Sequence, residues 1–268
     1  MSHHAAFAHV LSNVIEPFAE RTGAERRFPR AAVTALGQAG LLGLTVSADL
    51  GGGGLRLSDA ADVVARTAAA CPATAAVLQS HYAAVAVIEA HGSPWMRAEI
   101  AAGRHLGSLA LAEGVPGEQV LRTPQGPALA SRSTATRTGE VVALRARKHE
   151  VVAAGEADSY VWSSRPLAAE DGLTLWTVPA HAPDLFVPAR TDGGPYGSAT
   201  STVVADPVLV PADAMLGQDG GGFDIVLRTV LPWLRELRAA LGAGAVHPSL
   251  EVAAAAEPGR LPVASLAS

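Results

Sequence analysis

The sequence predicts an α+β fold in three consecutive parts. These are a helical domain over residues 1–105, a middle antiparallel β-barrel or β-sandwich over 106–218, and the start of a second helical domain over 219–268. Apolar residues three and four apart fill the first part, which is the helical period. Short β-rich runs separated by Gly, Pro and charged residues fill the middle. Helical spacing returns after Gly222, so the strands form a layer between two helical segments.

The composition excludes several classes of protein. The chain has 268 residues and a net charge of -5, and it lacks the Lys/Arg clusters that nucleic-acid binding needs. Its one cysteine, Cys71, permits no internal disulfide, fits a cytoplasmic location and is expected to be a small buried hydrophobe. No secretory leader is visible, and the apolar runs break before the ~20 residues of a membrane span.

The first helical part begins with a proline-led helix. Pro29 suits a first helical position, and the apolar residues that follow it keep helical spacing. The run Gly51–Gly54 then interrupts the chain and is expected to be a flexible turn, with a phosphate cradle as the alternative. Ser58 is the expected N-cap of the next helix, with Asp59 near its positive end.

Proline and glycine also mark the next two helices. Pro72 is expected to open a long helix, and Gly92 to end it in a left-handed conformation. Ser93 and Pro94 then start a short helix that Gly103 stops.

The middle part consists of short β-rich runs. Their spacing favours antiparallel pairing over βαβ units. The expected strands lie within residues 106–113, 127–134, 140–146, 158–164, 173–179 and 201–210. The chain turns helical again after Gly222, and Pro232 is expected to kink or divide that helix.

Four segments carry motifs in a fixed order. They are FPRAAVTALGQAGLLGL and its continuation at 28–64, LALAEGVPGEQ at 109–119, LRARKHEVVAAGEADSYVW at 144–162 and ADPVLVPADAMLGQDGGGFDIVL at 205–227. Together they resemble the FAD-dependent acyl-CoA dehydrogenase family. The resemblance covers about residues 28–244, and family members continue with further C-terminal helices, so a C-terminally shortened and divergent member is expected.

The resemblance implies where a flavin would bind. The family's Thr-Glu-Pro-x-x-Gly-Ser-Asp strand corresponds to 112–119, where Ala112 replaces the Thr, Glu118 replaces the Ser, and Glu113 and Gly117 are kept. In the third motif, Glu150 replaces the Trp that covers the flavin. Val152 replaces a Thr that hydrogen-bonds it. The implied cofactor-binding residues are Leu111, Ala112, Glu113, Gly117, Glu118, Glu150, Val151 and Val152.

No catalytic or metal-binding residue is predicted. In some members of the family the catalytic carboxylate precedes a helical Arg; aligning Arg235 to that Arg places Leu234 at the base position, and Glu236 points elsewhere. The nine His show no metal spacing. His81 falls where related flavin monooxygenases keep a His, but a satisfied or exposed His is the favoured interpretation. Glu113 and Glu118 are interpreted as a solvated strand end.

Three functions follow from the resemblance. The leading hypothesis is an FAD oxidoreductase acting on CH–CH groups, or a subunit of one, that oxidises an acyl-CoA or acyl-carrier thioester and needs a partner for the base. The alternatives are a non-catalytic binding or scaffold protein of the same fold and a flavin-dependent monooxygenase. A homo-oligomer, or a hetero-oligomer with a similar subunit, is expected. The reason is an apolar stripe that the last helix would expose, formed by Val226, Leu227, Val230, Leu234 and Leu237.

Overall fold

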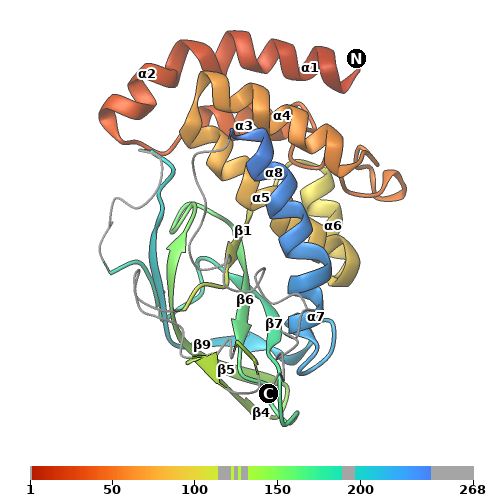
Figure 1. The fold of residues 1–268 in the computed structure, drawn as a ribbon, viewed down its shortest axis with the longest axis vertical. Helices are drawn as coiled ribbons and strands as arrows, with labels where there is room; N and C mark the ends of the chain where they lie inside the picture. The colour runs from red at the N-terminus through yellow and green to blue at the C-terminus, as the bar shows by residue number, and fades with distance from the viewer. Residues whose placement is uncertain (1, 114–121, 124–125, 128–131, 189–196, 243–268) are drawn as a thin grey trace, which may run out of the picture.

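The computed structural model shows a helical layer at one end and two four-stranded β-sheets at the other (Figure 1). The last helix runs alongside α4 and α5. The structure describes residues 2–113, 122–123, 126–127, 132–188 and 197–242. The predicted α+β class, with helices before and after a β layer, is confirmed.

The helical layer is built around one buried helix. Most residues of α5 are buried, on all its sides, so it is the centre of the layer. The helical elements are α1 (His3–Val10), η1 (Leu11–Ile15), α2 (Glu16–Glu25), α3 (Arg30–Gln38), η2 (Ala48–Leu50), α4 (Leu57–Ala70), α5 (Pro72–His91) and α6 (Pro94–Ala101).

The predicted boundaries of these helices are confirmed in part. Pro72 opens α5 and the Ser93 hydroxyl caps α6, as expected. Helix α4, however, is capped at Arg56, whose N–H donates to the Asp59 carboxylate at 2.9 Å, so Ser58 lies inside the helix. Gly92 is extended (φ -79°) instead of left-handed.

The run Gly51–Gly54 is a packed loop, which corrects the prediction of a flexible turn. Its four N–H groups all donate to backbone carbonyls, among them those of Gly43 and Val46. A Cβ on Gly53 would lie 2.4 Å from the Leu44 oxygen, so glycine is needed for close backbone approach. With every amide used, the loop has no donor left to cradle a phosphate.

The β part contains two four-stranded sheets. One has the order β1 (Gly107–Ala110), β6 (Ser159–Ser164), β7 (Thr174–Pro179), β10 (Met215–Leu216). The other has the order β4 (Thr134–Thr138), β5 (Val141–Val151), β9 (Ser201–Pro211), β8 (Leu185–Phe186). Strands β2 (Arg122–Thr123) and β3 (Gly126–Pro127) form a separate pair.

One strand pair departs from the antiparallel prediction. Strands β1 and β6 are parallel, with Gly107 opposite Ser159. Strands β4 and β5 of the second sheet lie between these two strands in the sequence, so the connection leaves the first sheet and returns to it. The remaining pairs of the two four-stranded sheets are antiparallel, as expected.

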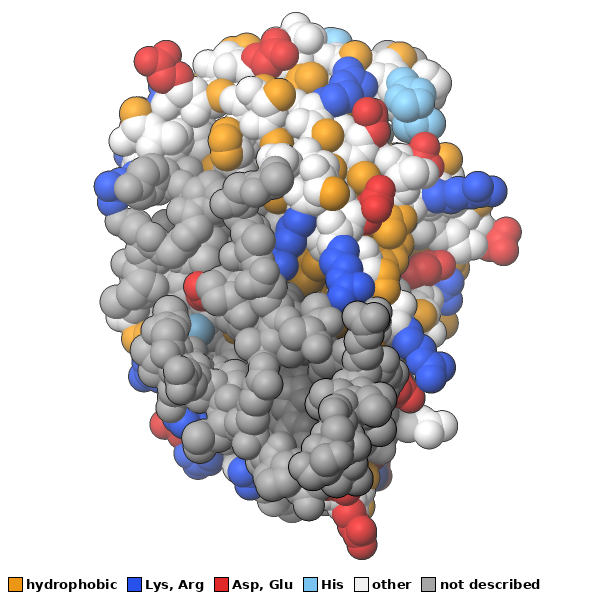
Figure 2. Space-filling model, in the orientation of Figure 1, with side chains coloured by type: hydrophobic (Ala, Val, Ile, Leu, Met, Phe, Trp, Pro, Cys, Tyr) orange, Lys and Arg blue, Asp and Glu red, His pale blue; other side chains and the backbone are white. Residues whose placement is uncertain are grey.

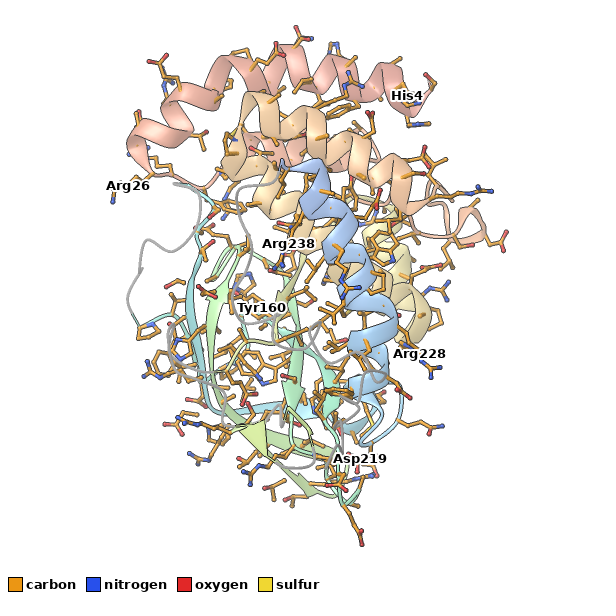
Figure 3. All side chains as sticks on the ribbon, viewed as in Figure 1. His4, Arg26, Tyr160, Asp219, Arg228 and Arg238 are labelled. Carbon is orange, nitrogen blue, oxygen red and sulfur yellow. The ribbon has the colours of Figure 1, made fainter. Side chains whose placement is uncertain are left out.

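The core of the β part is aromatic. Trp162, Trp176 and Tyr160 are fully buried. The Tyr160 hydroxyl accepts from Gly155 N–H at 2.8 Å (Figure 3), and burial raises the pKa of this phenol to about 12. These side chains stand on β6 and β7 and hold the first sheet in place.

Asp219 ties together two loops ahead of the last helix (Figure 3). Its carboxylate accepts from the N–H groups of Leu167, Ala168 and Ala169 at 2.8–3.0 Å and from the Thr174 hydroxyl at 2.6 Å. Asp219 follows the 3-10 turn η3 (Ala212–Ala214) and strand β10 in the sequence, and it precedes α7 (Gly222–Ile225). The Gly-rich connection between β10 and α7 is thus a structural joint.

The last helix contains a π-helical segment before Pro232. After α7 comes η4 (Val226–Val230) and then α8 (Leu231–Ala240), and Leu231 N–H donates to the Val226 oxygen five residues back. A π segment takes up the irregularity that Pro232 imposes, because proline lacks the next N–H.

The predicted exposed stripe on this helix is wrong. Its residues face α4 and α5, and four of its five side chains are at most 6% exposed, while Leu227 is half-buried. The helical layer covers the stripe from within the same chain. The stripe therefore supplies no argument for oligomerisation.

Candidate functional site

The structure brings together the two segments that were predicted to face a flavin. The chain leaving β1 at Leu111–Glu113 lies against the end of β5 at Lys148–Val152. His149 N–H donates to the Ala112 oxygen at 2.9 Å, and the Ser108 hydroxyl donates to the Val152 oxygen at 2.6 Å. This contact between β1 and β5 is called the strand junction below.

The end of β5 is irregular at the junction. The pairing of β5 with β9 shifts register between Lys148 and Val151. Glu150 and Ala153 have positive φ angles of 54° and 55°, a region that non-glycine residues seldom occupy. A bulge of this kind redirects side chains and is frequent beside functional sites. The sequence motif therefore becomes a strained turn in the structure.

A buried ion pair joins the two sides of the junction. Lys148 is 0% exposed and the Glu113 side chain 8%. The Lys148 ammonium donates to Glu113 Oε1 and, at 2.7 Å each, to the Ser163 carbonyl and hydroxyl. Its Nζ also lies 5.3 Å from the centre of the Trp162 ring.

The Glu113 carboxylate is not a solvated strand end, which corrects the prediction. It accepts from Ser133 through both the N–H and the hydroxyl, and from Arg132 N–H. Burial lowers the pKa of Lys148 from 10.5 to about 8, although the Glu113 charge acts in the opposite direction. The sequence analysis missed this buried lysine, although the two-residue period of β5 could have indicated it. Val142 and Leu144 point inward, and Lys148 lies an even number of residues further along the same strand.

The comparisons with known proteins fit this fold. Residues 4–103 match the family model described as the acyl-CoA dehydrogenase N-terminal domain. The human mitochondrial short-chain specific acyl-CoA dehydrogenase is 28% identical over 223 residues, which cover 80% of this chain and 52% of that protein. Together these matches support a member of the acyl-CoA dehydrogenase family.

Other relatives extend the comparison. An acyl-CoA dehydrogenase of Bacillus subtilis is 28% identical over 227 residues, covering 80% of this chain and 56% of that protein. The solved structure of butyryl-CoA dehydrogenase from Megasphaera elsdenii has the same fold, with a TM-score of 0.78 and 21% identity over 90% of this chain and 65% of that chain. The chain thus spans about half the length of the curated relatives it matches.

The backbone of this junction keeps the fold of the acyl-CoA dehydrogenase structures, whereas its side chains lack the groups that the family resemblance assigns to flavin contacts. Ala112 and Val152 stand where the family resemblance places hydroxyl donors, and neither side chain can donate a hydrogen bond. Val151 is fully buried and faces the core. Glu150 puts a carboxylate where the family has an indole. Backbone groups would therefore hold most of a flavin ring.

Two predicted cofactor residues cannot be placed. Gly117 and Glu118 lie outside the described residues. The other six lie at the strand junction, where Leu111 accepts a 3.4 Å hydrogen bond from the Ser163 hydroxyl. Their role in flavin binding stays a prediction.

The predicted base position holds no base. Leu234 is 6% exposed and packs in the core, whereas Glu236 is exposed on the opposite side of α8. A carboxylate with a raised pKa beside the acyl chain is what α-proton abstraction needs. On α8, neither position supplies it.

His81 has a structural role. It is fully buried, its Nδ1 accepts from Gly107 N–H at 3.1 Å, and its Nε2 pairs with the Leu42 oxygen at 2.9 Å. Burial lowers the pKa of this imidazole to about 4. The ring is neutral and both of its nitrogens are hydrogen-bonded within the fold, which agrees with the prediction of a histidine with satisfied hydrogen bonds. Neither nitrogen is left for a monooxygenase-like role.

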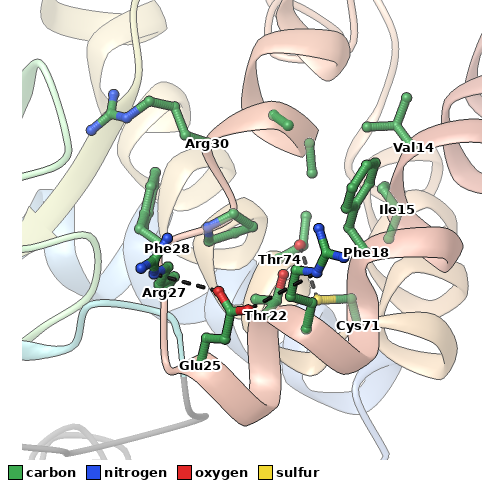
Figure 4. A pocket seen from close by; sticks show the side chains of 14 residues that line it. Val14, Ile15, Phe18, Thr22, Glu25, Arg27, Phe28, Arg30, Cys71 and Thr74 are labelled. Carbon is green, nitrogen blue, oxygen red and sulfur yellow. Dashed lines mark hydrogen bonds and ion pairs between the residues drawn. The ribbon is translucent and has the colours of Figure 1, made fainter.

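A pocket of about 190 Å³ lies away from the strand junction (Figure 4). Helices α2 and α3 and the start of α5 form it, and Phe18, Phe28 and Cys71 are among its lining residues. Cys71 is 3% exposed, as predicted, and its sulfur accepts from the Thr74 hydroxyl at 3.2 Å. None of the junction residues lines this pocket.

Other classes of site find no support in the described residues. Among them, no group of three or more His, Cys, Asp and Glu side chains could hold a metal ion. In the same part of the chain, no helix combines the length and hydropathy needed to cross a bilayer. On the face shown in Figure 2, basic side chains are scattered among acidic and apolar ones.

Proposed function

We propose that this chain is an FAD-binding acyl-CoA dehydrogenase-like protein that acts on an acyl-CoA or acyl-carrier thioester, together with a partner subunit that supplies the base. The observation that carries the proposal is the strand junction. It keeps the two family segments in contact, through the 2.9 Å hydrogen bond from His149 to Ala112, although their flavin-facing side chains have changed.

The proposed reaction removes a proton from Cα and a hydride from Cβ of the acyl group. FAD is the hydride acceptor in this chemistry. The part left to this chain is to bind and orient the ring through backbone groups at 111–112 and 150–152 and to exclude water with a buried core beneath them. Leu234 makes the base position on α8 apolar, and the proposal therefore assigns the carboxylate to the partner subunit.

The first experiment is an absorption spectrum of the purified full chain after incubation with FAD and removal of unbound cofactor. The two visible bands of oxidised flavin are expected to stay with the protein. Bleaching of these bands by a short acyl-CoA is expected only after the partner subunit is added. A folded protein that stays colourless at saturating FAD would contradict the proposal.

A gain-of-affinity variant sharpens this test. The double variant Ala112→Thr and Val152→Thr restores both family hydroxyls, and it is expected to tighten FAD binding by about tenfold or more, because each neutral hydrogen bond contributes about 1 kcal/mol. Val141→Thr is the matched control, since Val141 is 40% exposed on the far end of β5. Equal FAD affinity in all three proteins would exclude the junction as the flavin site.

The second candidate is a non-catalytic acyl-thioester binding protein of the same fold. The loss of side-chain donors at Ala112 and Val152 and the apolar Leu234 favour it. Calorimetric titration with acyl-CoA separates the two functions. Tight acyl-CoA binding by a protein that never retains FAD would favour this candidate.

A further inference from the structure

The buried pair Lys148–Glu113 uses its full hydrogen-bonding capacity. The three donors of the Lys148 ammonium go to Glu113 and to the carbonyl and hydroxyl of Ser163. Both oxygens of Glu113 accept, from Lys148, Ser133 and Arg132 N–H. A buried charge pair is tolerated only when its polar groups are satisfied in this way.

The pair connects four chain segments at one point. Glu113 leaves β1, Ser133 precedes β4, Lys148 lies in β5 and Ser163 lies in β6. These strands belong to different sheets, since β1 and β6 are in one and β4 and β5 in the other. The pair therefore fixes the distance between the sheets where residues 111–113 meet residues 148–152.

Stability alone does not explain a charged pair in this place. Apolar side chains of similar volume replace buried ion pairs in proteins at little cost, or with a gain in stability. A charged pair with fixed partners defines one geometry, whereas an apolar contact permits several. This precision matters at the junction, because backbone groups there would have to meet a rigid ring.

We propose that Lys148 and Glu113 are positioning residues for FAD binding, which hold the backbone at 111–112 and 149–152 at the spacing that the flavin ring needs. The inference rests on the proposed function. It adds Lys148 and replaces the expected direct contact of Glu113 with the flavin by an indirect role, because both side chains act through the strands they join. A site of this kind depends on the residues that hold its contacting groups in place.

The pH dependence of the full chain gives the first test, and it needs no substitution. The groups facing the Lys148 ammonium are Glu113 from the β1 side, Ser163 and Trp162 from β6, and Ser133 from the β4 side; of these, only Glu113 is charged. Burial lowers the pKa of Lys148 to about 8 in the folded protein, from the ordinary value of 10.5 that applies to the unfolded chain. Because the unfolded chain holds this proton to higher pH, this group makes folding more stable as pH rises above 8.

Positioning and mere stabilisation therefore predict opposite results. Loss of the Lys148 charge is expected to weaken FAD binding by about tenfold between about pH 7 and about pH 9.5, the range in which this lysine deprotonates. The contribution of Lys148 to the unfolding free energy is expected to increase over the same range. FAD affinity that stays constant, or that rises with stability, would overturn the proposal.

A charge-free pair provides the second test. In the double variant Lys148→Met and Glu113→Gln no charge is left unpaired, and FAD affinity at neutral pH is expected to fall by about tenfold and to lose its dependence on pH. Arg104→Met is the matched control. It breaks the exposed 2.6 Å pair of Arg104 with Glu99 and is expected to leave FAD binding unchanged.

The outcomes separate the two proposals. If the unmodified chain retains no FAD, the proposed function fails before this inference is reached. If the unmodified chain and the folded double variant bind FAD equally at every pH, the positioning role fails and the proposed function stands. If the double variant does not fold, the pH series of the unmodified chain decides alone.

Discussion

His81 is expected to make the protein sensitive to mild acid. The ring joins α5 to the loop after α3 and to the start of β1, through Leu42 and Gly107. It is fully buried, and desolvation lowers its pKa from 6.5 to about 4. The folded protein therefore carries a neutral imidazole at pH values at which the unfolded chain already binds a proton.

The sign and the size of the effect follow from this pKa difference. The unfolded state takes up the proton first as pH falls, so the contribution of His81 to stability is complete above pH 6.5 and is lost as pH falls towards about 4. A shift of this size corresponds to about 3 kcal/mol in total, of which about 2.5 kcal/mol would be lost between about pH 7 and about pH 4.5.

Urea unfolding at these two pH values measures the loss. His81→Gln is the informative variant, because an amide keeps one donor and one acceptor but does not titrate. The unmodified protein is expected to lose about 2.5 kcal/mol more than this variant on acidification. His105, whose pKa burial also lowers, is present in both proteins, and its charge repulsion with His81 is part of the difference that the comparison measures. An equal loss in the two proteins would refute the assignment.

Three further substitutions test the packing of the fold outside the strand junction. Gly103→Ala is expected to lower the free energy of unfolding by at least about 2 kcal/mol more than Gly40→Ala does, as measured by chemical denaturation. Both glycines have φ near 70°. A Cβ at 103 would lie 2.1 Å from the Gly37 oxygen, whereas a Cβ at 40 would have no atom within 4 Å. Leu237→Ala is expected to lower the midpoint of thermal unfolding and to cost about 2–5 kcal/mol, whereas Leu209→Ala, at a side chain 61% exposed, should change little. Asp219→Ala is expected to cost about 1–3 kcal/mol in urea unfolding. Burial raises the pKa of Asp219, but its hydrogen bonds outweigh this effect and lower the pKa to about 2. The stability that this carboxylate contributes is therefore present above pH 3.8 and is lost as pH falls towards about 2. An Asp219→Ala variant as stable as the unmodified protein at neutral pH would contradict this expectation.

Local patterns were sufficient for the order of the elements. Helical and two-residue periods are properties of neighbouring side chains, so the helical first part, the β-rich middle and the return to helix could be predicted from sequence. The starts at Pro72 and Ser93 also follow from local chemistry. The helix does end at Gly92 as predicted, but the conformation of this residue could not be predicted. Gly92 is extended (φ -79°), and a Cβ there would lie 2.6 Å from atoms of Ile88.

Contacts between distant residues explain most of the errors. The burial of the stripe on α8 depends on α4 and α5, which lie far away in the sequence. The parallel pairing of β1 with β6 depends on a connection that passes through the other sheet. No periodicity within either segment contains this information.

The sequence by itself determined the class of fold, the family frame and the loss of the flavin-facing side chains at Ala112 and Val152, because each of these is a matter of residue identity and short-range spacing. Only the tertiary structure decided that Glu113 is paired with Lys148, that Glu150 occupies a left-handed turn and that Leu234 is buried. Burial and ion pairing depend on which surfaces meet after the chain has folded, and in this protein those surfaces come from segments that are distant in the sequence.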